Sequence, residues 1–265
     1  MRTQNTIKVL FIGDIVGRPG RQAVKKYLAS EKAKYDFVIA NGENLSGGCG
    51  MTVEKYQEML DNGIDYFTSG NHIWNNAGFV PYLDHKSTRV VRPANYPSSA
   101  PGRGYAEVKI KNKHVVVANL QGRVFMPDEI EDPFVAGKEI ADKFSDSIII
   151  VDFHAEATSE KIALGYYLDG KVSAILGTHT HVQTADEKIL KNGTAYISDV
   201  GMCGPYESVL GVKKEIIIEK FLTQLPQSHK VASGETIFNA VAVVLDPATG
   251  KALEIKRIIE NNPLD

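Results

Sequence analysis

The segment Ala174-Ile-Leu-Gly-Thr-His-Thr-His-Val182 contains the pattern around which the rest of this sequence is organised. Its apolar residues 174–176 are typical of a short buried strand, and Gly177 ends that strand. His179 and His181 then follow one residue apart. Because alternate side chains of an extended segment point the same way, both imidazoles can reach one point or two adjacent points. Imidazole binds borderline divalent metals, but loop histidines are common, so the ends of the other strands decide what this pair means.

Polar side chains also follow the other apolar runs of the sequence. Runs over 7–12, 37–40, 66–69 and 147–153 are typical of buried strands, and each ends at a glycine, a polar turn or a histidine. Ligand sites in open α/β sheets gather outside the carboxyl ends of the strands. The candidate site residues at these strand ends are Asp14, Glu43, Asn44, Asn71, His72, His154, His179 and His181.

The order of the predicted elements indicates the fold class. Helices over 21–32 and 52–60 alternate with the first strands, which implies parallel pairing with crossover helices. Strands over 105–110 and 114–119, separated by Lys111-Asn112-Lys113, form a predicted hairpin. The remaining predicted elements are helices over 132–143, 158–168 (with Thr158 or Ser159 as N-cap) and 213–222, strands over 174–176, 188–190, 195–197, 238–246 and 251–257, and a turn-rich loop over 199–205. We predict one domain, residues 1–265, built as a four-layer α/β/β/α sandwich of two mixed sheets.

Composition excludes several classes of protein. The 265 residues carry a formal net charge of −2, and no basic arm or basic stripe with aromatics interrupts the chain, which disfavours a binder of duplex nucleic acid. No apolar stretch approaches the ~20 residues of a membrane-spanning helix, and the first residues do not read as a signal peptide. Two cysteines, Cys49 and Cys203, do not make a disulfide framework, so we expect a reducing cytoplasm.

The strand-end residues together indicate divalent metals. Each residue singly has an ordinary explanation, since Asp14 could form a turn, Glu43 could be solvated and His154 could be a hydrogen-bonded core histidine. Independent turns have no reason to share one chemistry, however, and four of the seven histidines lie at strand ends. Carboxylates, imidazoles and amide oxygens are too many for one tetrahedral ion and enough for two. Glu43 can bridge two ions through its two oxygens.

The ordered motifs resemble those of calcineurin-like metallophosphoesterases. They are Gly13-Asp14, Gly42-Glu43-Asn44, Gly70-Asn71-His72, His154 and Gly177-Thr-His-Thr-His181. The usual Asp-x-His motif is Asp14-Ile15-Val16 here, and the usual bridging aspartate motif is replaced by the glutamate motif. Both departures resemble the YmdB-like branch, bacterial phosphodiesterases active on 2′,3′-cyclic and related cyclic mononucleotides. The similarity runs from about Ile7 to Arg257 and includes the stretches 91–95, 119–123, 152–160, 180–186 and 199–202.

The resemblance implies two metal ions per chain, divalent or of mixed valence. One would be held by Asp14, Glu43, Asn44 and His181, with Asn44 supplying the ligand that Val16 cannot. The other would be held by Glu43, Asn71, His154 and His179. The family leans to iron or manganese, and mixed nitrogen and oxygen ligands also suit zinc.

The same resemblance implies a hydrolytic mechanism for a small cyclic nucleotide. A hydroxide bridging the two metals would attack phosphorus in line with the leaving ribose oxygen. His72 is the candidate general acid, and its alternative role is to orient Asn71 or the water. Arg18, Arg92 and Arg123 lie in loops where an arginine could hold phosphate, but they are kept out of the catalytic set because such arginines are often structural. A thiol of Cys49 or Cys203 could tune the metals or simply fill a turn.

Other functions remain compatible with these residues. A ribonuclease or a protein phosphatase could use the same metals, although a ribonuclease should show a basic track. A regulatory protein could use the metals to sense a nucleotide. Structural metal sites tend to be fully ligated, so a non-ligand His72 beside the metals favours catalysis. Exposed edge strands in the antiparallel sections are compatible with a homo-oligomer.

Overall fold

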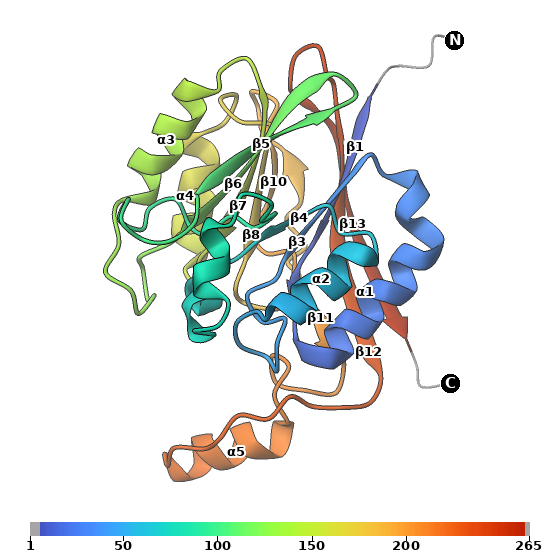
Figure 1. The fold of residues 1–265 in the computed structure, drawn as a ribbon, viewed down its shortest axis with the longest axis vertical. Helices are drawn as coiled ribbons and strands as arrows, with labels where there is room; N and C mark the ends of the chain where they lie inside the picture. Colours follow the sequence, from blue (N-terminus) through green and yellow to red (C-terminus); the bar gives the residue numbers. More distant parts are fainter. Residues whose placement is uncertain (1–5, 263–265) are drawn as a thin grey trace.

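A computed structural model describes residues 6–262 of the chain as two β-sheets packed face to face, with helices on both outer sides (Figure 1). The alternation of side chains along β1 (Ile7–Ile12) shows how the layers arise. Ile7, Val9 and Phe11 lie in the apolar cluster between the sheets, whereas Leu10 and Ile12 lie in the cluster under the helices. Because a strand turns successive side chains to opposite faces, one strand contributes to both cores. The predicted four-layer α/β/β/α sandwich is confirmed.

The first sheet has the order β2-β11-β12-β1-β3-β4, with β13 paired to the other side of β12. Strands β1, β3 and β4 run parallel, whereas β12 runs antiparallel to β1 and to β13. The carboxyl ends of the three parallel strands therefore meet at one edge. The bounds of the other six strands are β2 (Asp14–Ile15), β3 (Phe37–Asn41), β4 (Tyr66–Thr68), β11 (Met202–Pro205), β12 (Thr236–Leu245) and β13 (Ala252–Asn262).

The second sheet has the order β5-β6-β7-β8-β10-β9. Its central strands are parallel, and Gln121 lies beside His154, which lies beside Thr178, so three strand ends are in register. The hairpin of β5 and β6 turns through Lys111 and Asn112, both with positive φ, as predicted. The bounds are β5 (Tyr105–Ile110), β6 (Lys113–Gln121), β7 (Ile148–His154), β8 (Ala174–Thr178), β9 (Lys188–Ile189) and β10 (Ala195–Ile197).

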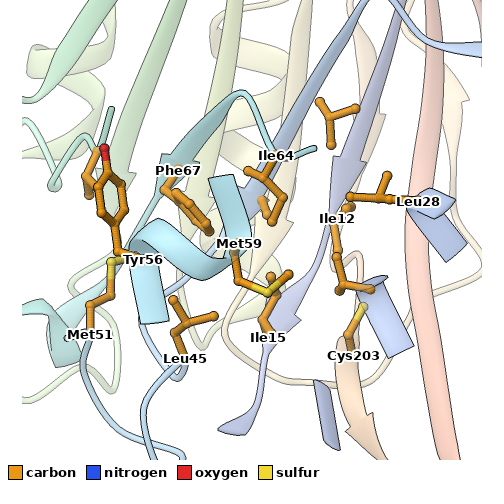
Figure 2. Close-up of a cluster of buried hydrophobic side chains, with 14 of the residues drawn as sticks. Ile12, Ile15, Leu28, Leu45, Met51, Tyr56, Met59, Ile64, Phe67 and Cys203 are labelled. Carbon is orange, nitrogen blue, oxygen red and sulfur yellow. The ribbon is translucent and has the colours of Figure 1, made fainter. Parts of the chain in front are cut away.

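Helices cover the outer face of each sheet. Helices α1 (Gly17–Glu31) and α2 (Val53–Asp61) pack on the first sheet, and Figure 2 shows Leu28 and Met59 of these helices beside Ile12, Ile15 and Phe67. Helices α3 (Pro133–Lys143) and α4 (Thr158–Tyr167) pack on the second sheet. Helix α5 (Lys214–Thr223) projects from the body (Figure 1). Short 3-10 helices cover Lys32–Lys34, Asn71–Asn75 and Val80–Asp84.

Three local predictions are wrong. Helix α1 begins at Gly17 rather than residue 21, because Pro19 lies in the first helical turn, where proline is tolerated. The segment predicted as a turn-rich loop contains β11, which pairs with β2 and β12. Neither Thr158 nor Ser159 is the N-cap of α4, since the cap position is Ala157 and makes no side-chain hydrogen bond.

Candidate metal centre

The predicted site residues lie at the carboxyl ends of five parallel-paired strands, from both sheets. Strand β1 leads to Asp14, β3 leads to Glu43 and Asn44, and β4 leads to Asn71 and His72. From the second sheet, β7 ends in His154 and β8 leads to His179 and His181. The two sheets are joined here by Asn41, whose Nδ2 donates to Asp152 Oδ2 at 3.0 Å. The site is therefore built where both sheets end together.

Glu43, His154 and His179 form the centre of the group. Nε2 of His154 lies 3.1 Å from Glu43 Oε1, 3.1 Å from His179 Nδ1 and 3.3 Å from Asn71 Oδ1. One ligand atom from each of Glu43, His154 and His179 lies within 4.8 Å of the other two, which is close enough for one metal ion to bind all three. Glu43 and His154 are fully buried, so their alignment is fixed by packing.

The remaining predicted metal ligands are Asp14, Asn44 and His181. The Asp14 Oδ2 atom accepts a hydrogen bond from the backbone N–H of His179 at 3.2 Å, and Oδ1 lies 3.8 Å from His181 Nε2. Among the described residues, the buried oxygens without a hydrogen-bond partner include Asp14 Oδ1 and Asn44 Oδ1, and also Gln183 Oε1 and Asn239 Oδ1. Buried oxygens are normally satisfied, so the unpartnered Asp14 Oδ1, which lies near His181, fits a cation ligand.

Burial and mutual charge shift the pKa values of these groups. Burial alone would raise the pKa of Glu43 and lower that of His154. Their ion pair overrides burial, so the pKa of Glu43 falls to about 2 and that of His154 rises to about 9. Burial and the neighbouring His154 lower the pKa of His179 to about 3, and burial raises the pKa of Asp14. In the group of Glu43, His154 and His179, His154 is therefore the protonated imidazole at neutral pH and His179 is the neutral one.

The donor set fits a divalent metal ion at Glu43, His154 and His179. Asn71 Oδ1 lies 3.3 Å from His154 Nε2 beside these ligands, and Asp14 and His181 lie 3.8 Å from each other. Gly70 permits this approach, because a Cβ there would overlap the Glu43 carboxylate and the His154 ring. The glycine before Asn71 is thus a packing requirement of the site as well as a turn signal.

A buried ion pair holds the turn that carries His179 and His181. Both histidines have positive φ, 100° and 65°, which is costly for residues with a side chain. The Lys161 Nζ atom donates to Thr178 O at 2.7 Å and to Asp199 Oδ2 at 2.7 Å, and Asp199 Oδ2 also accepts from Thr180 N at 3.0 Å. The Lys161–Asp199 pair therefore fixes the backbone on both sides of His179 through hydrogen bonds to Thr178 and Thr180.

Two further acidic residues orient the histidines. Thr178 Oγ1 lies 2.9 Å from His154 Nδ1 and donates to Asp152 Oδ1 at 2.7 Å, so the Nδ1 side of His154 is engaged and Nε2 faces the centre. His179 Nε2 lies 3.1 Å from Glu156 Oε2. Sequence reasoning missed Asp152, Glu156, Lys161 and Asp199 as supporting residues. Asp152, Glu156 and Asp199 lie within the quoted stretches 152–160 and 199–202, and Lys161 lies one residue beyond the first of them.

His72 lies beside the centre and is partly exposed. Its backbone N–H donates to Glu43 Oε2 at 3.1 Å, and its ring Nδ1 lies 3.3 Å from Cys49 Sγ. Asn75 Nδ2 donates to the same sulfur at 2.9 Å. The Nδ1 side of the ring is therefore occupied by the thiol, and Nε2 is left for other partners. Cys203 is buried under α1 and its Sγ contacts Asn239 O.

The three loop arginines have different surroundings. Arg92 is buried, and its guanidinium donates to backbone carbonyls of the loop 93–101, which is a structural role. Arg123 forms an exposed ion pair with Asp132 at 2.6 Å. Arg18 lines a surface pocket together with Arg21, Lys55 and the loop residues Ser46 and Gly47.

Comparison with known proteins identifies the family of this chain. A family model described as YmdB-like protein matches residues 10–258. The chain belongs to the YmdB-like family. It is 47% identical to the 2′,3′-cyclic-nucleotide 2′-phosphodiesterase of Bacillus subtilis (strain 168) over 260 residues, which are 97% of this chain and 98% of the relative. The predicted family and the predicted enzyme class, a phosphodiesterase, are thereby confirmed.

Two solved structures share this fold over nearly the whole chain. A phosphatase from Mycoplasma pneumoniae superposes with a TM-score of 0.93 at 36% identity, covering 98% of this chain and 95% of that chain. A hypothetical protein from Thermus thermophilus gives 0.92 at 40% identity, covering 97% of this chain and 100% of that chain. Within residues 6–262, no helix of this YmdB-like chain has the length and apolarity needed to cross a membrane.

Proposed function

We propose that this YmdB-like protein hydrolyses 2′,3′-cyclic mononucleotides at a centre of two metal ions. The observation that carries the proposal is the convergence of Glu43, His154 and His179 within 4.8 Å, with the Asp14 carboxylate accepting from the His179 backbone N–H beside them. The name of the Bacillus subtilis relative supports the choice of substrate class. Iron or manganese is the proposed metal, with zinc as the alternative, and the cytoplasm is the proposed location.

We assign the proposed metal ligands to the two ions as follows. Asp14, Asn44 and His181 would hold one ion, Asn71, His154 and His179 would hold the other, and the Glu43 carboxylate would bridge them. When bound, the two ions supply an activated water and neutralise charge on the phosphoryl oxygens. Asp152 and Glu156 keep His154 and His179 aimed at the ions through the hydrogen bonds described above.

His72 would donate the proton that the leaving ribose oxygen needs. Its ring is partly exposed next to Glu43, so it can reach a bound substrate, and Cys49 contacts its Nδ1 side. As an imidazolium, His72 would donate its Nδ1 proton to the Cys49 sulfur and keep its Nε2 proton, on the side away from Cys49, for the leaving oxygen. General-acid catalysis of this kind contributes typically ~10²–10⁴-fold to the rate.

The test measures metals and turnover on the same preparation. We expect close to two metals per chain by elemental analysis in protein purified without chelator, with turnover of 2′,3′-cyclic AMP exceeding that of 3′,5′-cyclic AMP and of a phosphomonoester. Turnover of the monoester alone would identify a phosphatase. Two metals with no turnover of any substrate, even after manganese is added, would identify the regulatory alternative.

A matched pair of variants tests the bridging residue. Glu43→Gln removes the shared charge and is expected to lower metal content and abolish turnover. Glu54→Gln, an exposed change of the same kind at the start of α2, is the control and should leave both unchanged. Wild-type rates in folded Glu43→Gln protein would refute the proposed role of Glu43.

A further inference from the structure

Phe125 combines unusual exposure with a strained backbone. Among the described residues it is the most exposed large apolar side chain, with an exposed fraction of 85%. Its φ is 63°, a backbone conformation that bulky side chains rarely adopt. Such a residue persists only where its surroundings hold it, and strained residues gather at functional sites. The exposed ring therefore calls for a function that depends on an aromatic side chain at this position.

The neighbours of Phe125 hold its segment in place. The Glu160 carboxylate accepts hydrogen bonds from the backbone N–H groups of Arg123 and Val124, at 3.0 and 3.2 Å. On the other side of Phe125, Met126 is buried and its N–H donates to Arg123 O at 3.4 Å. The ring is thus presented in a defined position, which lowers the entropy cost of binding a ligand.

The segment of Phe125 begins beside the candidate metal centre. Gln121 ends β6 in register with His154, and Gly122 N donates to His154 O at 3.0 Å. Because a chain advances at most ~3.6 Å per residue, the Cα atoms of Gly122 and Phe125 lie at most about 11 Å apart. The ring therefore lies at the rim of the centre, within reach of a molecule that is bound there.

A line of contacts also joins Phe125 to the His72 side of the centre. Trp74 is two residues beyond His72, and its ring lies against Tyr96 with the centroids 5.2 Å apart. Tyr96 Oη donates to Gln121 Oε1 at 3.3 Å, where the Phe125 segment begins. The proposed general acid and the exposed ring therefore belong to one wall of the site.

We propose that Phe125 is a specificity-determining residue that stacks on the nucleobase of the substrate. In a 2′,3′-cyclic nucleotide both ester oxygens belong to the ribose that carries the base. A leaving oxygen that takes its proton from His72 therefore brings the attached base to the His72 side of the centre. Aromatic side chains stack on every base, because each base has a π face. This inference rests on the proposed function of the metal centre.

Phe125→Gly separates base stacking from a structural role. Glycine adopts a positive φ without steric cost, so this variant should melt at or above the wild-type temperature. Loss of one base–aromatic stack should raise KM for 2′,3′-cyclic AMP about 5–150-fold, with kcat close to the wild-type value. Phe125→Trp keeps an aromatic ring and should restore the wild-type KM.

A substrate without a base is the control for this experiment. Glycerol 1,2-cyclic phosphate contains the same five-membered cyclic diester, so its KM and kcat should be equal in the wild type and in Phe125→Gly. Tyr166→Ala is the control variant, because it removes a ring that is 62% exposed near the C-terminal end of α4. It should leave the constants for both substrates unchanged.

The results distinguish a failure of this proposal from a failure of the proposed function. An unchanged KM for 2′,3′-cyclic AMP in Phe125→Gly would overturn the stacking role, and so would equal losses on this substrate and on glycerol 1,2-cyclic phosphate. The proposed function would survive both results, because the wild type is active in each. Wild-type protein that binds two metals and turns over no cyclic nucleotide would refute the proposed function and the stacking role together.

Discussion

The ammonium group of Lys161 lies 2.7 Å from the Asp199 carboxylate, and both side chains are almost completely buried. The two residues come from α4 and from the loop before β11, and they meet under the turn of His179 and His181. Breaking a buried pair leaves one charge uncompensated and typically costs about 3–5 kcal/mol of the free energy of unfolding. Removal of either partner should therefore destabilise the fold, and the contacts of the pair also predict an effect on metal binding.

Lys161→Met should lower metal affinity as well as stability. Without the Nζ donor, the left-handed turn at His179 loses one of its two supports, so the histidine ligands are less well placed. We expect a lower melting temperature without metal and a smaller increase of that temperature on adding metal, because the increase reports affinity. If Lys161 had a purely structural role, the melting temperature without metal would fall and the metal-induced increase in melting temperature would stay unchanged.

Arg92→Met is the matched control for Lys161→Met. Arg92 is likewise a buried cation, but its guanidinium serves the carbonyls of the loop 93–101 rather than the histidine turn. This variant should also lose stability while keeping the full metal-induced increase in melting temperature.

His72→Asn should lower the catalytic rate in a way that depends on the leaving group. We expect kcat for a cyclic nucleotide to fall about 10²–10⁴-fold, because an alkoxide leaving group needs a proton. A p-nitrophenyl diester, whose leaving group is acidic, should lose much less. Metal content should stay at the wild-type value, since His72 is not a proposed ligand. Equal losses on both substrates would show that His72 acts on the metal centre or the attacking water instead.

Metal affinity should rise with pH because of His154. Its ring, with a pKa of about 9, is protonated at neutral pH, so a metal ion must displace that proton. The apparent affinity should therefore increase about tenfold per pH unit below about pH 9 and level off above it. His179, with a pKa of about 3, is already neutral and adds no such dependence.

The pH dependence is measured by competition with a chelator and by calorimetric proton release. Glu43→Gln should shift the rise to lower pH, because loss of the carboxylate lowers the pKa of His154. An affinity that stays flat between about pH 6 and about pH 9 would contradict a protonated His154 in the free protein.

Gly70→Ala should abolish metal binding, although the substitution adds only one methyl group. The added methyl group would overlap the Glu43 carboxylate and the His154 ring, so both ligands must move. Gly78→Ala is the control, because a methyl group there meets only the Asn76 side chain at 3.3 Å. Elemental analysis should find metal lost in the first variant alone. Normal metal content in Gly70→Ala would show that the ligands can shift without cost.

The sequence by itself determined the long strands of both sheets and the residues that follow them, but not the short strand β11. The apolar runs of β1 and β7 are local patterns, and they place Asp14 and His154 at or just beyond strand ends. Parallel strands bring their carboxyl ends to one edge, so convergence of the site could also be predicted.

Only the tertiary structure decided which side chains support the site residues and which helix projects from the body. Lys161 and Asp199 are 38 residues apart, and their pairing depends on how α4 packs on the second sheet. The positive φ of His179 and the projection of α5 likewise have no local signal in the sequence. Burial and backbone strain are set by contacts between distant segments, whereas periodicity is set by neighbours along the chain.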